Sequence, residues 1–378
     1  MKRVAVVCIC LLTAVVASAQ SGPSAPPDDG PAAGSVSAAA PAASSVAQDE
    51  HDQHGAANGP SMHLQGFTDV DFSQTDDPKS PGGFSLGQFA GHLSASLGPK
   101  VSFFAETTFT AHPDSFTVEV ERAILRYDYN DSFKISVGRY HTPINYWNTA
   151  FHHGLWLQTT ISRPDMIQLG GTFEPTHFVG LLAEGTVGPP TAGLGYNFGV
   201  GNGRGAILSR AGDAGDVNRN RAWLGKIYAR PAALYRVEFG AAVYHDSLTL
   251  PTIDGVPELI TSAYVAVTRE TPEIIAEFAN VHHHDPISTI DYSSQAYYVQ
   301  AAWRFARWPV LKPYGRFEKM LGVAGEPVFG DVSSSTGTLG MRYELTDQVA
   351  LKGEYRHIVR PTTGAIINGA FAQVALTF

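Results

Sequence analysis

Hydrophobic and polar residues alternate along the chain from Met62 to Phe378, in segments of about ten residues that turn residues separate. Period-two alternation places apolar side chains on one face of a strand and polar side chains on the other. The last segment shows the pattern clearly, because Val374, Leu376 and Phe378 share one face and Gln373 lies on the opposite face. Strands of this kind are typical of a transmembrane β-barrel.

Counting these segments predicts about sixteen strands. We expect them at 62–73, 84–97, 101–112, 116–129, 133–140, 177–187, 193–203, 220–230, 235–247, 258–269, 273–284, 293–306, 311–321, 334–345, 349–359 and 367–378. Short turns alternate with longer connections, near 75–82, 141–176, 204–219, 248–257, 285–292, 322–333 and 360–366. No apolar run approaches the roughly 20 residues that a membrane helix requires. The expected fold class is all-β, an antiparallel transmembrane barrel over 61–378 with both ends on the periplasmic side.

The N-terminal residues differ from the rest of the chain. Lys2 and Arg3 precede an apolar run over 4–16, and small residues follow, so 1–19 is expected to be a secretory signal peptide. Residues 20–60 are mostly Ala, Ser, Gly and Pro, which predicts a disordered periplasmic arm that is either a plain spacer or an attachment to another envelope component. Cys8 and Cys10 both fall in the removed part, which excludes thiol chemistry in the exported protein.

The stretch from Arg139 to Pro175 is the one long interruption of the strand pattern. Its aromatic and aliphatic content is too high for a free surface loop, and segments of this length are usually functional or disordered. We expect it to fold back inside the barrel and narrow the pore. Residues 166–173 also fit a short strand; we assign them to the loop because an extra strand would break the up-and-down parity.

Seven residues are the candidates for the pore constriction: Tyr146, Trp147, His152, His153, Trp156, Gln158 and Arg163. The aromatic members are expected to pack against the inner wall. The polar members, including both histidines, are expected to face the water column. Phe378, a terminal aromatic residue on the apolar face, is the candidate assembly signal.

Parity predicts a set of charges that point into the lumen: Arg122, Arg126, Lys134, Arg304, Arg316, Glu318, Arg342, Glu344, Lys352, Glu354 and Arg356. The basic members could form a wall that attracts anions. Alternatively, acids and bases on the same face pair with each other and are structural. A formal net charge of −9 for the whole chain makes strong anion selectivity the lesser expectation.

Two adjacent segments carry a family resemblance. The run over 121–127 (ERAILRY) and the run over 133–143 (FKISVGRYHTP) resemble the phosphate-selective porin family, in which an acidic-x-Ala-x-Leu-x-Tyr strand leads into a Val-Gly-aromatic-Pro strand end. The resemblance implies a trimeric outer-membrane diffusion channel of sixteen strands whose third long loop folds inward. Arg139 and Tyr140 stand where the family more often has Gln and Phe, so phosphate selectivity does not carry over.

Histidine and nucleophile clusters raise two other kinds of chemistry. His152 with His153, and the run His282 to His284, are the groups that could bind a metal, but adjacent strand residues point to opposite faces, so we expect solvated loop histidines and no metal site. The only compact set for a hydrolase is His152 or His153 with Ser162 and Asp165, and no glycine elbow or oxyanion device accompanies it. We therefore expect no catalytic residue and no cofactor.

The expected function is a porin in the outer membrane of a Gram-negative-type bacterium, which lets small hydrophilic solutes or anions diffuse through a loop-constricted pore. Its expected partners are membrane lipid and two further copies of the chain, with no nucleic acid. A structural or adhesive barrel with a plugged lumen is the alternative, and a barrel-borne lipase or protease is a more distant one.

Overall fold

The computed structural model describes residues 61–80, 82–151, 153–168, 170–330 and 332–378. The expected signal peptide at 1–19, the expected arm at 20–60 and His152 lie outside the described residues.

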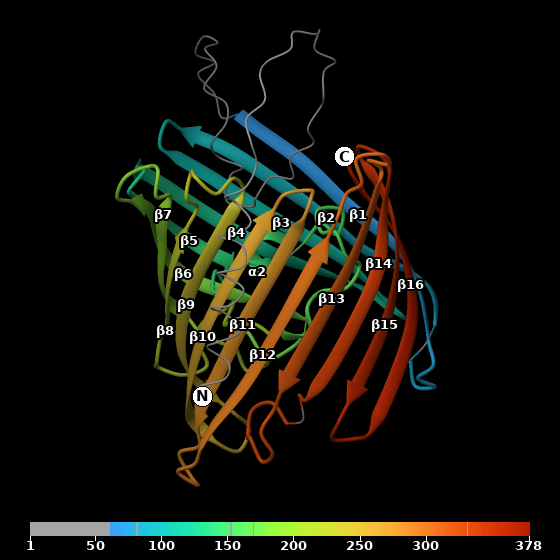
Figure 1. Cartoon of the computed structure of the whole chain (residues 1–378). Helices are drawn as coiled ribbons and strands as arrows, with labels where there is room; N and C mark the ends of the chain where they lie inside the picture. Colours follow the sequence, from blue (N-terminus) through green and yellow to red (C-terminus); the bar gives the residue numbers. More distant parts are fainter. Residues whose placement is uncertain (1–60, 81, 152, 169, 331) are drawn as a thin grey trace. The chain divides into compact units, whose positions relative to one another are not determined.

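Within the described residues, sixteen antiparallel strands form a closed barrel in which each strand pairs with the next along the chain (Figure 1). The first eight strands are β1 (Ser61–Thr75), β2 (Gly83–Gly98), β3 (Val101–His112), β4 (Ser115–Asn130), β5 (Phe133–His141), β6 (His177–Val187), β7 (Leu194–Asn202) and β8 (Ala222–Ala229). The others are β9 (Val237–Thr249), β10 (Asp254–Thr268), β11 (Glu273–His284), β12 (Asp291–Ala302), β13 (Leu311–Leu321), β14 (Ser334–Thr346), β15 (Val349–Arg360) and β16 (Ala365–Thr377). The predicted fold class is confirmed.

The barrel closes where the two ends of the chain's β-region meet. β1 pairs with β16 in a register that sets Phe67 opposite Thr377. Gly66 and Phe378 then exchange two backbone hydrogen bonds, of 2.8 and 3.0 Å. Closure leaves no free strand edge, which is the condition for a sheet to sit in a bilayer without unpaired backbone groups.

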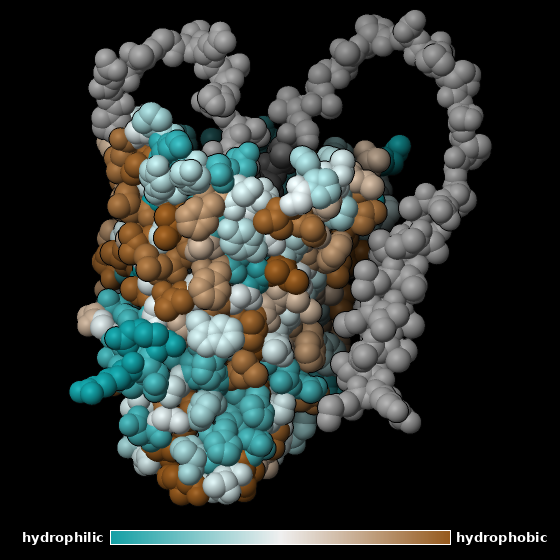
Figure 2. Space-filling view, turned by 90° about the vertical axis from the view of Figure 1, so that its left-hand side faces the viewer, coloured by the Kyte–Doolittle hydropathy of each residue, from teal (hydrophilic) through white to brown (hydrophobic). Residues whose placement is uncertain are grey.

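The outer face of the wall is apolar, as the alternation predicts. Leu339 is 69 % exposed and Phe378 is 60 % exposed, although both are large hydrophobic residues. Figure 2 shows a broad apolar band on the side of the barrel toward the viewer, with polar residues gathered at the lower end. Aromatic residues near the short turns point outward too: Tyr127, Tyr129, Trp303, Phe305, Tyr343 and Phe378. This is the composition of a surface that lipid covers, with aromatic side chains at the interface.

Two strand limits differ from the prediction by more than two residues. β10 begins at Asp254 instead of 258, because the strand continues through Pro257 and a glycine in the left-handed region, Gly255 with φ 72°. β12 ends at Ala302 instead of 306, because the chain turns where Phe305 bridges to Trp308. Residues 166–173 contribute no strand in the part that is described; a short 3-10 helix, η1 (Asp165–Ile167), lies there instead.

The same connection between β5 and β6 also holds a short α-helix, α2 (Trp147–Phe151). No helix among the described residues is both long enough and apolar enough to span a bilayer. Inward-facing apolar side chains of β5, β6 and β8 to β13 form the main buried cluster together with residues of this connection, so the core lies between the wall and the connection.

Candidate functional site: the barrel interior and the segment 142–176

The segment 142–176, which joins β5 to β6, is pinned together at its base. The Thr142 amide donates to the Thr176 carbonyl oxygen at 3.0 Å. Asn148 Nδ2 donates to both of those residues' carbonyl oxygens, at 3.1 and 2.8 Å. Asn145 caps α2, since its Oδ1 accepts from the Asn148 amide at 2.7 Å. The two ends of the segment are therefore held together before its middle part contacts the wall.

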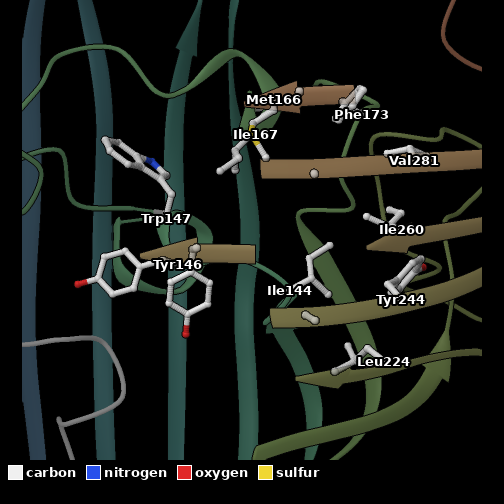
Figure 3. Packing of buried hydrophobic residues seen from close by; sticks show 14 of the residues in the cluster. Ile144, Tyr146, Trp147, Met166, Ile167, Phe173, Leu224, Tyr244, Ile260 and Val281 are labelled. Carbon is white, nitrogen blue, oxygen red and sulfur yellow. The ribbon is translucent and has the colours of Figure 1, made fainter. Parts of the chain in front are cut away.

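The first half of the segment contacts the inner face of β10 to β12. The backbone amides of Tyr146 and Trp147 each donate to a Glu277 carboxylate oxygen at 2.8 Å, and the Tyr298 hydroxyl donates to the same carboxylate. Trp147 is completely buried, and its ring meets the Tyr298 ring edge to face at 6.1 Å. Figure 3 shows Tyr146 and Trp147 among the other buried hydrophobic residues of this cluster. Apolar contact and a shared carboxylate thus hold α2 on the wall.

Its second half contacts β13 to β15 through charged side chains of the wall. Arg316 donates to the Ser162 and Arg163 carbonyl oxygens, both at 2.9 Å. Glu354 accepts from the Ile161 amide at 2.9 Å, and Glu318 accepts from the Asp165 amide at 2.6 Å. These wall charges therefore bind four backbone groups of the segment, two carbonyl oxygens and two amides.

Two more basic residues of the wall hold the middle of the segment, over residues 155–160. Arg342 donates to the Gln158 carbonyl oxygen at 2.8 Å, and its guanidinium lies 5.5 Å from the Trp156 ring centre. Lys352 donates to the carbonyl oxygens of Leu155 and Thr160, at 2.5 and 3.0 Å. Because the segment covers them, these charges are buried rather than exposed to a water column.

Most of the expected pairs within the charge set are present. Arg316 pairs with Glu318 and Arg342 pairs with Glu344, both at 2.8 Å, and Arg356 lies 3.2 Å from Glu354. Arg304 pairs with Glu344 at 3.0 Å and with Glu270 at 2.7 Å. Lys352 is different, because its ammonium group binds the carbonyl oxygens of the segment. The charged residues on this side of the barrel therefore pair with each other or bind the segment 142–176, and they do not form an uncovered basic wall.

The basic side chains of β4 and β5 are less covered than those of Arg316 and Arg342. Arg122 pairs with Glu106 at 2.7 Å, and Arg126 pairs with Asp128 at 2.5 Å and Glu184 at 3.3 Å. The side chains of Arg122 and Arg126 keep 15 % and 18 % of their surface exposed. Lys134 is half-buried, opposite Glu184 in the register. Together with Arg304 and Arg356, whose side chains are 21 % and 20 % exposed, these are the candidates among the predicted lumen charges for contact with a passing ion.

Three polar members of the predicted constriction were placed wrongly. His153, Gln158 and Arg163 are 3 %, 0 % and 7 % exposed, so they do not face a water column. His153 contacts Gln88 and Glu121, and Gln158 Nε2 donates to the Ile161 carbonyl oxygen. Burial lowers the pKa of Arg163 to about 10. Tyr146 and Trp147 are buried and Trp156 is half-buried, as expected of residues that pack on a wall.

The histidine run at the end of β11 also differs from the expectation of solvated loop residues. His283 is 1 % exposed and lies between Glu258 at 3.0 Å and Glu326 at 2.8 Å. His282 and His284 point the other way, toward Asp291, and keep 39 % and 42 % of their side-chain surface exposed. The alternation of strand side chains explains both positions.

The hydrolase candidates have separate partners. Ser162 Oγ accepts from Arg316 Nη2 at 2.6 Å, and Asp165 accepts from the Thr336 hydroxyl at 2.8 Å. His153 contacts Gln88 and Glu121 instead. The described partners of Ser162 and Asp165 are thus wall residues, and His152, the other candidate base, lies outside the described residues.

Sequence reasoning missed the carboxylates that organise the interior. Glu277 is the clearest, since it accepts from two amides of α2 and lies 3 % exposed among inward-facing apolar residues of β11. Its signal in the sequence is an acid that stands between two apolar residues, Ile275 and Ala279, on the inward-facing side of β11. Glu174, within the segment, is a second: burial raises its pKa to about 8, so the carboxyl is protonated at neutral pH.

A cavity of about 380 Å³ adjoins the segment next to the short connection between β8 and β9. Tyr146 lines it on one side and Arg230, Tyr235 and Glu238 line it on the other. Arg230 is 45 % exposed in its side chain and pairs with Glu238 at 2.6 Å. Tyr146, the residue just before α2, therefore borders space that water can enter.

No protein-family model and no curated sequence matches the chain. Solved structures do match. An anion-selective porin from Comamonas acidovorans is similar with a TM-score of 0.63 and 11% identity, over 84% of this chain and 100% of that one. The outer-membrane channel DcaP of Acinetobacter baumannii is similar with a TM-score of 0.62 and 13% identity, over 85% and 99%. The trimer form of OmpT, an outer membrane protein of Vibrio cholerae, is similar with a TM-score of 0.58 and 12% identity, over 85% of this chain and 100% of that one. The barrel of this chain therefore has the fold that these outer-membrane proteins share.

Proposed function

We propose that the chain is an outer-membrane porin that lets small hydrophilic solutes diffuse through a barrel narrowed by the segment 142–176. The observation that carries the proposal is the docking of this segment on inward-facing side chains, Glu277 on one part of the wall and Arg316 on another. A segment held in this way reduces the cross-section without a mobile gate. The apolar outer band and the likeness to porin structures support a location in the outer membrane.

Assembly as a homotrimer is part of the proposal. Its support is the trimer form of one structural neighbour and the resemblance of 121–127 and 133–143 to the phosphate-selective porins. Selectivity for phosphate is not part of the proposal, because Arg122 and Arg126 are themselves paired with acidic side chains. We propose a general diffusion channel without catalytic activity.

Swelling of liposomes tests the function with solutes of graded size. Purified protein in liposomes is expected to admit pentoses and hexoses and to admit trisaccharides more slowly, since a narrowed pore sieves by size. Liposomes with no protein, and liposomes with heat-denatured protein, are the controls. Swelling no faster than in these controls for every sugar would overturn the proposal.

One observation favours a second candidate, a structural barrel with a closed lumen. Gln300, Arg316 and Glu318 face inward, yet each is at most 3 % exposed. In the swelling assay a closed barrel would admit none of the sugars. Turnover of ester or peptide substrates by the same preparation would instead favour an enzyme.

Neutralising Arg126 is expected to shift ion selectivity toward cations while the fold stays intact. Arg126 is partly exposed and balances Asp128 and Glu184, so Arg126→Gln leaves two carboxylates at the channel surface. The reversal potential in a salt gradient measures the shift. Arg307→Gln, at an exposed position between β12 and β13, is the matched control and should leave the potential unchanged. An equal potential for parent and Arg126→Gln would place Arg126 outside the ion path.

Loss of the terminal aromatic residue is expected to impair assembly. Phe378 lies on the outer face, with its ring centre 5.9 Å from that of Phe89, and a Cβ on Gly66 would fall 2.3 Å from the Phe378 ring. Phe378→Ala should therefore lower the yield of folded, heat-modifiable barrel in the outer membrane. Tyr129→Ala, which removes an aromatic ring of similar exposure from the same end of the barrel, is the control. Normal yield of Phe378→Ala would contradict its role as an assembly signal.

A further inference from the structure

Three histidines from separate parts of the chain meet inside the barrel wall. His141 ends β5, His177 begins β6, and His153 comes from the segment between them. One ring nitrogen from each lies within 4.8 Å of the other two. Their side chains are 4 %, 7 % and 0 % exposed, so the cluster is enclosed by protein.

The rings are oriented by neighbours that engage the Nδ1 atoms. His153 Nδ1 lies 2.9 Å from Gln88 Oε1, and His177 Nδ1 lies 3.2 Å from the Thr176 hydroxyl oxygen. The Nε2 atoms of both rings then point at one carboxylate oxygen, Glu121 Oε2, at 3.3 and 2.8 Å. A bond to one ring nitrogen that fixes the direction of the other is the usual arrangement around histidine ligands of metals.

His141 reaches the same place from the other side. Its Nε2 lies 3.2 Å from Glu106 Oε2, and its ring centre is 5.7 Å from that of His153 and 5.6 Å from that of His177. Three imidazoles and two carboxylates therefore surround one small volume. Imidazole and carboxylate groups are ligands that zinc and copper ions bind well.

We propose that His141, His153, His177 and Glu121 form a binding site for a divalent first-row transition-metal ion, with Zn²⁺ as the tetrahedral case. Tetrahedral zinc with ligands near 2.1 Å holds its donor atoms about 3.4 Å apart. The histidine nitrogens, now within 4.8 Å, would each move inward by less than about 1 Å to reach that spacing. Rotation of the imidazole rings supplies a movement of this size.

The charges around the site accommodate the ion. Arg139 contacts Glu121 at 3.3 Å but also pairs with Asp213 at 2.7 Å, so it keeps a partner when Glu121 binds the metal. Glu121 Oε1 accepts from the Thr108 hydroxyl at 3.0 Å, which holds the carboxylate in place. Glu106 stays paired with Arg122 and adds negative charge beside the ion.

A metal ion at this position would tie the segment 142–176 to the wall through His153, because His141, His177 and Glu121 belong to β5, β6 and β4. His141 and His177 flank the two ends of the segment, and His153 belongs to its first half. The ion would therefore oppose any movement of the segment away from β5 and β6. Metal binding at this site does not require conduction, so the metal site and the proposed channel can be tested separately.

Zinc binding to the full chain, purified without a polyhistidine tag and stripped with EDTA, tests the proposal. After dialysis against micromolar ZnCl₂, elemental analysis is expected to find one more zinc ion per chain in the parent than in the double variant His141→Gln, His177→Gln. Zinc is also expected to raise the unfolding temperature of the parent and to leave that of the double variant unchanged. Equal zinc content in the two proteins would overturn the proposal, and so would no binding to the parent.

Two controls separate this site from other histidines. His283→Gln removes a histidine that is equally buried between two carboxylates, and it should retain the zinc. The pair His282→Gln, His284→Gln removes the exposed histidines beside Asp291 and should also retain it. Loss of the zinc in either control would place the metal at the end of β11 and contradict the proposal.

A spectrum of the parent protein keeps the proposal testable where the double variant does not fold. Co²⁺ in place of Zn²⁺ is expected to give the intense visible bands of a tetrahedral site, and Zn²⁺ is expected to abolish them by displacement. X-ray absorption at the zinc edge should show a first shell of nitrogen and oxygen atoms with imidazole scattering. A pale octahedral cobalt spectrum, or a zinc shell without imidazole, would overturn the assignment.

Discussion

Trp147→Ala is expected to destabilise the barrel by about 3–5 kcal/mol, the usual cost of removing a fully buried aromatic side chain. Trp147 is 0 % exposed and packs between Phe151, at 5.0 Å between ring centres, and Tyr298. Its loss would leave a cavity beneath α2 and loosen the first half of the segment 142–176. The free energy of unfolding, from urea titration of the protein refolded in lipid vesicles, measures the effect.

Two variants control for the loss of a tryptophan as such. Trp147→Phe keeps a ring in the cavity and should cost much less than alanine. Trp308→Ala removes a side chain that is 56 % exposed in the turn after β12 and should change the free energy of unfolding by less than about 1 kcal/mol. A cost for Trp147→Ala no larger than that of Trp308→Ala would mean that the segment is not packed on the wall.

Arg316→Met is expected to have an effect of similar size, about 3–5 kcal/mol, because it leaves a buried carboxylate without its partner. Arg316 and Glu318 are 3 % and 2 % exposed and 2.8 Å apart. The same guanidinium binds the Ser162 and Arg163 carbonyl oxygens and lies 5.8 Å from the Trp147 ring centre. The substitution should therefore release the second half of the segment as well.

The double variant Arg316→Met, Glu318→Leu separates the two causes. Removing both charges should recover part of the lost stability, since no buried charge is left unpaired. It should not restore the bonds to Ser162 and Arg163. Arg304→Met, whose side chain is 21 % exposed in its pairs with Glu270 and Glu344, should cost about 1 kcal/mol or less. A single Arg316→Met variant as stable as Arg304→Met would contradict this account of the docking.

Many strands of the wall were predictable, because the alternation of apolar and polar side chains is set by neighbouring residues in the sequence. The alternation of side chains gave β3, β6, β11 and β13 with the limits that the structure has. The prediction failed where the alternation of side chains continues beyond the last hydrogen-bonded strand pair. Trp303 and Phe305 still point outward, although β12 has already ended at Ala302. It also failed at the start of β10, where Pro257 and Gly255 resemble a turn. A period in the sequence identifies a face, but it does not show where hydrogen bonding stops.

The interior was predictable only in part, because parity says which side chains point inward and not what covers them. Arg316 and Glu318 were expected to be paired, and they are. Their burial beneath the segment 142–176 depends on contacts between residues far apart in the chain, as in the bond from Arg316 to Ser162. His153 was expected to face water for the same reason: the sequence does not reveal that His141 and His177 lie beside it.

Single-channel current across a planar bilayer tests the central claim most directly, that the barrel is a channel narrowed by the segment 142–176. The parent should give discrete open steps, and replacing 145–162 by a short Gly-Ser linker should give larger steps and weaker discrimination between ions. Replacing the exposed loop 286–290 by the same kind of linker is the control and should leave the step size unchanged. A parent that conducts with steps equal to those of the linker variant would place the constriction elsewhere, and bilayers that stay closed with both proteins would contradict the channel itself.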